Sequence, residues 1–351
     1  MKTLKERKSN KVELLAPAGD MEKFFTALHF GADAVYLAGR QFGLRAYSAN
    51  FSLDEIAFCC GYAHERGKKV YVTVNIYAND GDFDGLPDYI KKLYEAGADA
   101  ILVSDPGVIM LAREVAPGLT LHLSTQANAT NTRAAEFWLS QGVRRVVCAR
   151  ECTLAQIGKM IENCPKMEFE AFVHGAMCIS YSGRCLLSDY LVGRAANRGE
   201  CVQACRWKYF LRPEGREESL SADEDERGTY IFNSRDLNML EHIGDLIESG
   251  VCSLKIEGRM KSPYYVATVV NAYRRAIDNY YSGEKDFAPP RLQDELLKPS
   301  HRAYTTGFFY GRENEAKQYY QSSKADAESK FIAGVLSWEN GEALIEMRNR
   351  F

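Results

Sequence analysis

The chain lacks any apolar run of the ~18–20 residues that a membrane-spanning helix needs. Its start, MKTLKERKSNK, is basic and polar with no apolar segment behind it, unlike a secretory signal. We therefore expect a cytoplasmic protein with no membrane partner. Thiols stay reduced there, so ten cysteines in 351 residues do not predict a disulfide framework. A net charge of −3 gives no global basic field for nucleic acid, although a local basic patch is compatible with it.

Three short motifs are also missing. The sequence contains no HExxH of a zinc peptidase and no GxSxG elbow of a serine hydrolase. A Ser–His–Asp set is defined by geometry rather than by spacing, so a peptidase of that kind stays an open alternative. The cysteines form no CxxC pair, which is the arrangement that structural zinc sites usually use.

Eight short apolar runs alternate with helical patterns. Four of them follow a glycine that ends a helical stretch, where a left-handed residue is favoured, and their β-branched residues suit strands buried on both faces. These four runs begin at Gly31, Gly97, Gly142 and Gly250, and the others begin at Val12, Lys69, Leu119 and Phe169. Eight such units over about 260 residues predict an α/β fold, a TIM-like (β/α)8 barrel. A doubly wound open sheet is the alternative.

The predicted barrel occupies residues 1–283 and includes an insertion at 178–236, between the seventh and eighth strands. The middle of the insertion, PEGREESLSADEDERG, is acidic and rich in turn residues, which indicates a solvated loop. Residues 284–351 would form a C-terminal extension that begins a small β-domain, with a turn at Glu339-Asn340-Gly341. A lone hairpin is only marginally stable, so we expect this β-domain to be incomplete.

Polar residues follow several predicted strands, and in such barrels the chemistry takes place at the carboxyl ends of the strands. A basic residue there, as at Arg150 and Arg259, indicates binding of an anion. For Asn75 and Asp105, capping of a turn or helix is an equally good interpretation. The other candidates at strand ends are Ser124, Thr125, Gln126, Glu151, His174 and Glu257.

Four cysteines of the insertion are spaced as Cys178-x6-Cys185-x15-Cys201-x3-Cys205. Four thiolates suit tetrahedral zinc or an iron–sulfur cluster. The wide spacing and the nearby glycines favour a cluster wrapped by backbone amides, because such amides donate hydrogen bonds to sulfur. Buried structural thiols are the alternative, and core packing is the better interpretation for the other six cysteines of the chain.

Basic residues are concentrated in the same insertion, with aromatic residues between them. This combination could bind phosphate and stack on bases, although an ordinary basic surface would look similar. The basic residues are Arg184, Arg194, Arg198, Arg206, Lys208 and Arg212, and the aromatic residues are Tyr181, Tyr190, Trp207 and Tyr209.

Six motifs are distributed over nearly the whole chain. They are EAFVHGAMC from Glu170, GRCLLS from Gly183, ELLAPAGD, LHLSTQANATN, CxxxCRWKY and SLKIEGRMKSPYY. Together they resemble peptidase family U-32, the collagenase-like proteins. The resemblance is nearest to the branch of prephenate-dependent tRNA uridine 5-hydroxylases. The resemblance implies an oxygen-independent hydroxylase with a [4Fe–4S] cluster that acts on wobble uridine of tRNA with prephenate as co-substrate. Other members of the family imply ribosomal RNA or a quinone precursor as alternative substrates.

The resemblance also implies roles for single residues. Cys178, Cys185, Cys201 and Cys205 would ligate the cluster. Some relatives carry a further cysteine ligand where this chain has Asn238, so Cys205 would be the fourth ligand, or one iron would stay open.

The substrate roles are predictions from side-chain chemistry. Arg150, Arg259 and Lys261 would bind the carboxylates of prephenate, and His174 would transfer a proton. Gln126 would bind the edge of the pyrimidine, and Glu257 completes the catalytic candidates. Arg184, Arg206 and Trp207 would contact the tRNA. A U-32-type peptidase, or a non-catalytic iron–sulfur or RNA-binding scaffold, are the alternative functions.

Overall fold

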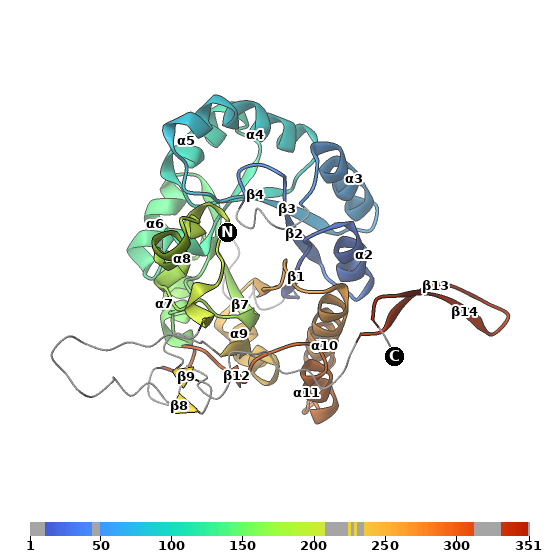
Figure 1. Cartoon of the computed structure of the whole chain (residues 1–351). Coiled ribbons are helices and arrows are strands. Elements are labelled where there is room, and N and C mark those ends of the chain that lie inside the picture. Colours follow the sequence, from blue (N-terminus) through green and yellow to red (C-terminus); the bar gives the residue numbers. More distant parts are fainter. Residues whose placement is uncertain are drawn as a thin grey trace.

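The computed structural model describes residues 11–43, 50–207, 224–225, 228–229, 235–311 and 331–349. Within them, eight parallel strands form a closed barrel surrounded by helices (Figure 1). The strands are β1 (Glu13–Pro17), β2 (Ala34–Ala38), β3 (Lys69–Val74), β4 (Ala100–Val103), β5 (Thr120–Leu123), β6 (Val143–Val147), β7 (Glu168–Ala176) and β11 (Ser253–Ile256). Because β11 pairs with both β1 and β7, the ring is closed. The predicted TIM-like barrel is confirmed, and the open-sheet alternative is wrong.

A helix follows each strand of the barrel on its outer side. These helices are α2 (Met21–His29), α3 (Leu53–His64), α4 (Leu86–Glu95), α5 (Pro106–Val115), α6 (Thr132–Ser140), α7 (Leu154–Asn163), α9 (Ile243–Ser249) and α10 (Pro263–Ser282). Local sequence fixes where several of them begin, since Ser52 and Thr153 form capping boxes and Asp105 caps α5. The four glycines predicted to precede strands all have positive φ angles.

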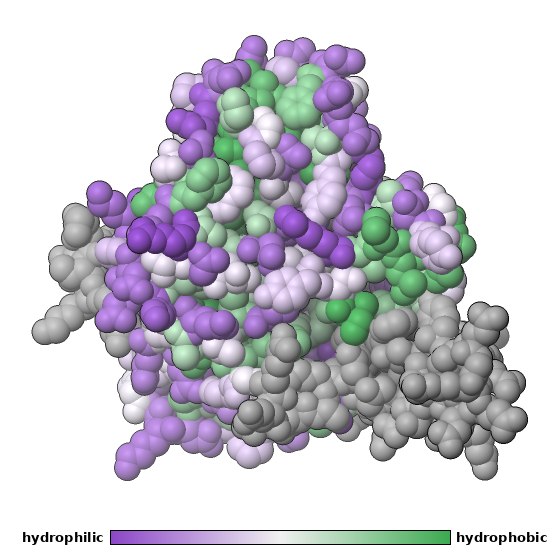
Figure 2. Space-filling model, turned by 90° about the vertical axis from the view of Figure 1, so that its left-hand side faces the viewer, coloured by the Kyte–Doolittle hydropathy of each residue, from purple (hydrophilic) through white to green (hydrophobic). Residues whose placement is uncertain are grey.

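One continuous apolar core lies between the strands and the helices. Strands β2 and β4 are buried along their whole length, as expected for strands covered on both faces. Their register is regular, with Val35 beside Val70 and Ile101 beside Leu121. The outer face on the left of Figure 1 carries polar and apolar residues intermixed (Figure 2). The core therefore holds the strand ends at fixed positions around the barrel mouth.

The insertion leaves the barrel at the end of β7. Its described part consists of short turns of helix, which are η3 (Tyr181–Gly183), α8 (Leu187–Val192), η4 (Ala196–Arg198) and η5 (Ala204–Arg206). In the acidic segment, β8 (Glu224–Asp225) pairs with β9 (Gly228–Thr229), and the rest of that loop lies outside the described residues. The chain returns through β10 (Asp236–Asn238), antiparallel to the end of β7, and then through η6 (Leu240–His242).

The C-terminal extension begins as part of the barrel. Helix α11 (Pro290–Leu297) packs on α10, β12 (Tyr304–Thr305) pairs with β10, and Leu292, Leu296 and Phe309 belong to the barrel core. The barrel packing thus continues past the predicted boundary at 283. Strands β13 (Ala333–Glu339) and β14 (Glu342–Met347) form a hairpin that extends away from the barrel (Figure 1), with the predicted turn at Asn340 and Gly341. No helix within the described ranges has the length and apolarity to cross a membrane.

Candidate active site

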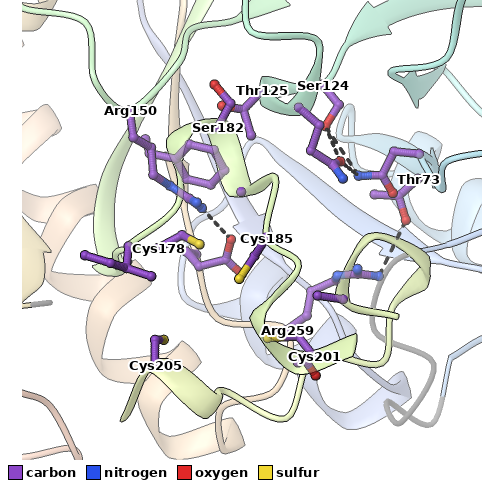
Figure 3. A pocket seen from close by; sticks show the side chains of 18 of the residues that line it. Thr73, Ser124, Thr125, Arg150, Cys178, Ser182, Cys185, Cys201, Cys205 and Arg259 are labelled. Atoms are coloured by element: carbon purple, nitrogen blue, oxygen red, sulfur yellow. Dashed lines mark hydrogen bonds and ion pairs between the residues drawn. The ribbon is translucent and has the colours of Figure 1, made fainter. Parts of the chain in front are cut away.

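Two adjoining cavities open where the insertion covers the carboxyl ends of the barrel strands. The inner cavity has a volume of about 140 Å³ and the outer one about 390 Å³. The insertion contributes the cysteines on one side of the inner cavity, and strand-end residues such as Thr73 and Ser124 lie opposite them (Figure 3). Five residues line both cavities, so they stand at the boundary between them. They are Arg150, Cys178, Cys201, Cys205 and Glu257.

The predicted cysteine set comes together at this place. Cys178, Cys185, Cys201 and Cys205 all line the inner cavity, and all four are free thiols. The other six cysteines do not line either of the two cavities, and most of them are buried in the core. The interpretation as core residues is confirmed for five of them, whereas Cys252 is only partly buried.

Backbone amides two residues further along the chain face three of the four thiols. The N–H of Leu187 donates to Cys185 Sγ at 3.4 Å, and the N–H of Gln203 donates to Cys201 Sγ at 3.4 Å. Burial raises the pKa of Cys178, while the backbone of Ser180 and the charge of Arg150 act in the opposite direction. Such donors stabilise a thiolate over a thiol. The left-handed Gln203 and the glycines of the insertion make these tight turns possible.

This donor set suits a cluster better than a single metal ion. Among the described residues, no three side chains of His, Cys, Asp or Glu are grouped closely enough to share one ion. Thiolates around an iron–sulfur cluster stand apart by the width of the cluster, and here four thiols line a common cavity. The amides that donate to sulfur are a further feature of cluster sites.

An ion pair separates the two cavities beside the thiols. Arg150 Nη2 lies 2.9 Å from Glu257 Oε2, and both side chains are mostly buried. The Arg150 guanidinium also covers the ring of Phe172 at 4.0 Å from the ring centroid. These contacts hold the guanidinium at the cavity boundary, where it can meet an anion on the outer side.

A network of neutral polar groups forms the opposite wall of the inner cavity. Asn75 Nδ2 donates to Gln126 Oε1 at 2.8 Å, and Ser124 Oγ donates to the same oxygen at 3.2 Å. Ser104 Oγ in turn donates to the Asn75 carbonyl at 3.3 Å. The wall is built from the ends of β3, β4 and β5, so three neighbouring strands position Gln126.

Lys255 is a cavity residue that the sequence analysis missed. It is the third residue of β11, and its side chain is 3% exposed. The ammonium nitrogen lies 2.9 Å from Glu170 Oε1 and 4.4 Å from the centre of the Tyr36 ring. Burial lowers its pKa, and Glu170 opposes that shift. A lysine inside an otherwise apolar, fully buried strand was the signal that could have found it.

His174 lies away from both cavities. Its ring is packed among Tyr265, Tyr273 and Tyr304, with centroid distances of 5.3 to 6.0 Å, and it lines neither cavity. Burial, together with the charges of Lys261 and His301, lowers its pKa to about 3. A buried neutral imidazole behind the strand does not reach a ligand in the cavities, so the structure does not support the predicted proton transfer by His174 there.

Asn238 also lies outside the cysteine cavity. Its Nδ2 donates to Gln293 Oε1 at 2.9 Å, and its Oδ1 accepts from the Leu240 N–H at 3.0 Å and from the Tyr273 hydroxyl at 3.3 Å. The side chain is therefore engaged in the contacts that hold β10 beside β7. It lines neither cavity.

The predicted substrate-binding residues are distributed unevenly. Arg259 lines the inner cavity, is 5% exposed and donates to Thr73 Oγ1 at 3.5 Å. Lys261 lines the outer cavity. Arg184 lines neither, and its Nε donates to the backbone carbonyl of Gln126 at 2.8 Å. Trp207 is 42% exposed and also lines neither cavity. The side chain of Arg206 lies outside the described residues, as do Lys208, Tyr209 and Arg212.

Comparison with known proteins shows to which family the chain belongs. The family model of peptidase family U32 matches residues 19–319. The chain belongs to peptidase family U32. A relative from Bacillus subtilis, tRNA hydroxylation protein P1, is 41% identical over 343 residues, which are 97% of this chain and 81% of that protein.

Other U32 relatives have different names. A 23S rRNA 5-hydroxycytidine synthase of Escherichia coli is 37% identical over 281 residues, which are 80% of this chain and 41% of that protein. A collagenase of Porphyromonas gingivalis is 34% identical over 315 residues, which are 86% of this chain and 74% of that protein. Membership of the U32 family alone therefore does not distinguish nucleobase hydroxylation from peptide hydrolysis.

Proposed function

We propose that this U32 protein is a cytoplasmic tRNA-modifying enzyme that hydroxylates wobble uridine at C5 without molecular oxygen, with a [4Fe–4S] cluster and prephenate as co-substrate. The observation that carries the proposal is the meeting of four insertion cysteines around one cavity at the barrel mouth. The relative named for tRNA hydroxylation supports the choice of substrate. Enzymes of the barrel class also have their active sites at this end of the strands.

The residues that would hold the cluster are Cys178, Cys185, Cys201 and Cys205. When bound, such a cluster supplies electron transfer or Lewis-acid chemistry at iron. The chain itself would supply the amides that stabilise the thiolates at Cys178, Cys185 and Cys201. It would also supply a partly closed cavity that limits access of water to the reacting atoms.

Cations around the outer cavity would bind the two carboxylates of prephenate. Arg150, Lys261 and Arg302 line this cavity, and Glu257 is the acidic residue among its lining residues. Arginine pairs well with carboxylates because its planar fork donates two parallel hydrogen bonds. Glu257 would hold Arg150 in position until the substrate carboxylate arrives. The inner cavity would then receive the uracil base on the side of Gln126, opposite the cysteines.

The peptidase alternative receives less support from the site. Ser124, Ser182 and Ser188 line the inner cavity, but no histidine lines either cavity in the described part of the chain. A serine nucleophile needs an adjacent base to become reactive. Peptide hydrolysis also does not require a set of four cysteines.

A complementation experiment tests the proposal. Digested tRNA from a deletion strain should lack 5-hydroxyuridine derivatives at the wobble position, and the wild-type gene should restore them. Cys178→Ala should not restore them, and the anaerobically purified variant should lose most of the roughly four irons expected per chain. Cys60→Ala is the matched control, because this buried thiol of α3 does not line the cavity. Unchanged modification in the deletion strain, or one zinc per wild-type chain, would contradict the proposal.

A further inference from the structure

The side-chain amide of Gln126 presents only one kind of hydrogen-bonding group to the inner cavity. Its Oε1 already accepts two hydrogen bonds, from Asn75 Nδ2 and Ser124 Oγ. Its Nε2 has no partner among the described residues, although the side chain is only 4% exposed and lines the cavity. A buried donor without a partner is costly, so such a group in a cavity points to a ligand with an acceptor.

The network fixes which end of the amide faces the ligand. Rotating the amide by half a turn would replace the 2.8 Å contact of Asn75 Nδ2 with Oε1 by a contact between two N–H donors, while the Ser124 hydroxyl can either donate or accept. Ser104 Oγ holds the Asn75 backbone at 3.3 Å, and Arg184 Nε holds the Gln126 carbonyl at 2.8 Å. The amide is thus held both through its side-chain contacts and through its backbone.

This arrangement distinguishes the two pyrimidines. Uracil carries a carbonyl acceptor at position 4, whereas cytosine carries an amino donor there. We propose that Gln126 is a specificity-determining residue, whose Nε2 donates to O4 of the target uracil and faces the amino group of cytosine unfavourably. This inference rests on the proposed function and deepens it. Bases in RNA loops can be splayed out and read along this edge by side-chain amides.

A neutral wall favours the base over the co-substrate as the partner of Gln126. The two side chains that hydrogen-bond the amide, Asn75 and Ser124, carry no charge, and the cations of the same cavity are Arg150, Lys255 and Arg259. A carboxylate binds best where guanidinium or ammonium groups converge, as Arg150 and Lys261 do around the outer cavity. An amide donor in a neutral wall matches the neutral carbonyl of a heterocycle.

Two substitutions should lower the preference for uracil over cytosine by different routes. In Gln126→Glu, one carboxylate oxygen keeps the contacts to Asn75 and Ser124, and the other presents an acceptor to the cavity. In Asn75→Asp, the new carboxylate should attract Nε2 of Gln126, which turns Oε1 toward the cavity. The matched control is Gln141→Glu, which adds the same charge after α6, away from the cavity.

The measurement is anaerobic binding of two RNA stem–loops that differ only in U or C at the first anticodon position. The preference of wild-type holoenzyme for U should fall by about 10- to 100-fold in both variants, the size expected when one buried group loses its partner. Gln141→Glu should keep the wild-type preference. Thermal unfolding of each variant shows whether it is folded. Gln126→Leu offers neither a donor nor an acceptor, so it should weaken binding of the U stem–loop without strengthening binding of the C stem–loop.

The outcomes separate this inference from the proposed function. If the wild-type gene restores hydroxyuridine but both variants keep the full preference for U, Gln126 does not read the base. The same conclusion follows if the variants change only the KM for prephenate, since Gln126 would then contact the co-substrate. If no hydroxyuridine depends on the gene, the proposed function fails, whatever the variants bind.

Discussion

Strand β7 and the insertion that follows it are one continuous stretch of chain, yet different interactions hold them in place. β7 is buried and lies between two parallel neighbours, β6 and β11. Among the described residues 178–207, by contrast, none belongs to the apolar core. The insertion is a series of short turns in which Ser182, Gly183, Gly193, Gly199 and Gln203 have positive φ.

The insertion is attached to the barrel mouth by polar contacts with loops at the strand ends. Arg198 makes two hydrogen bonds to the carboxylate of Asp82, and Ser182 donates its N–H to Glu151 and its hydroxyl to Asn128. The difference shows a division of roles. The barrel supplies rigidity through burial, while the insertion supplies ligand groups whose final order would depend on these contacts and on the bound cluster.

The largest expected effect lies inside the barrel, at Glu170. This carboxylate is fully buried, 2.9 Å from Lys255 Nζ and 3.2 Å from Arg145 Nη1. Glu170→Gln keeps the shape but removes the carboxylate that faces the buried Lys255, whereas Arg145 keeps its pairs with Glu13 at 2.6 Å and Glu168 at 3.2 Å. We expect the free energy of unfolding, measured with urea, to fall by about 3–5 kcal/mol.

A surface pair provides the control for Glu170. Arg133 and Glu136 on α6 are 2.8 Å apart, but their side chains are 90% and 42% exposed. Glu136→Gln should change the free energy of unfolding by less than about 1 kcal/mol, because water screens the pair. Equal losses in the two variants would mean that the buried network does not stabilise the barrel.

The next effect is the acid sensitivity of the barrel at His174. Its pKa is lowered to about 3 in the folded chain, mainly by burial, and is about 6.5 when unfolded. Below pH ~6.5 the unfolded chain therefore binds a proton that the folded chain does not. This contribution to stability is complete above pH ~6.5 and is lost at about 1.4 kcal/mol per pH unit as the pH falls toward 3.

His174→Phe keeps a ring among the three tyrosines but removes the titrating group. Between about pH 6 and 4, the free energy of unfolding should fall less steeply in the variant, by the equivalent of one proton. Urea unfolding at several pH values measures this slope. Identical slopes in the wild type and the variant would show that burial does not suppress the protonation of His174.

The barrel could be predicted from sequence because its rules are local and repeated. Apolar β-branched runs located all eight strands, and a glycine after a helix marked four of them. Strand β3 begins at the predicted Lys69, and β7 begins one residue earlier than predicted. The extension beyond 283 was harder. Its contacts to the core come from Leu292, Leu296 and Phe309, and no local pattern shows which surface they cover.

The candidate site was only partly predictable for a related reason. Spacing was enough to single out the four cysteines, since unusual residue types cluster in one insertion. The environment of His174 depends on β10, which comes from the far side of the insertion and covers that part of β7. The partners of Lys255 and the donor-only amide of Gln126 depend on contacts between several strands. Such contacts are long-range, so a single sequence does not reveal them.

The smallest effect on global stability should come from the attachment of the insertion. Two nitrogens of Arg198 lie 2.8 and 2.9 Å from the two carboxylate oxygens of Asp82, but the arginine side chain is 37% exposed. Because water screens the pair, Arg198→Ala should lower the free energy of unfolding by at most about 1 kcal/mol. Limited proteolysis should nevertheless cut residues 178–207 several-fold faster, because local opening becomes easier. Arg144→Ala, which removes a surface pair with Glu168, should leave cleavage there unchanged. A large loss of barrel stability in Arg198→Ala, with no faster cleavage, would mean that the insertion and the barrel unfold as one unit.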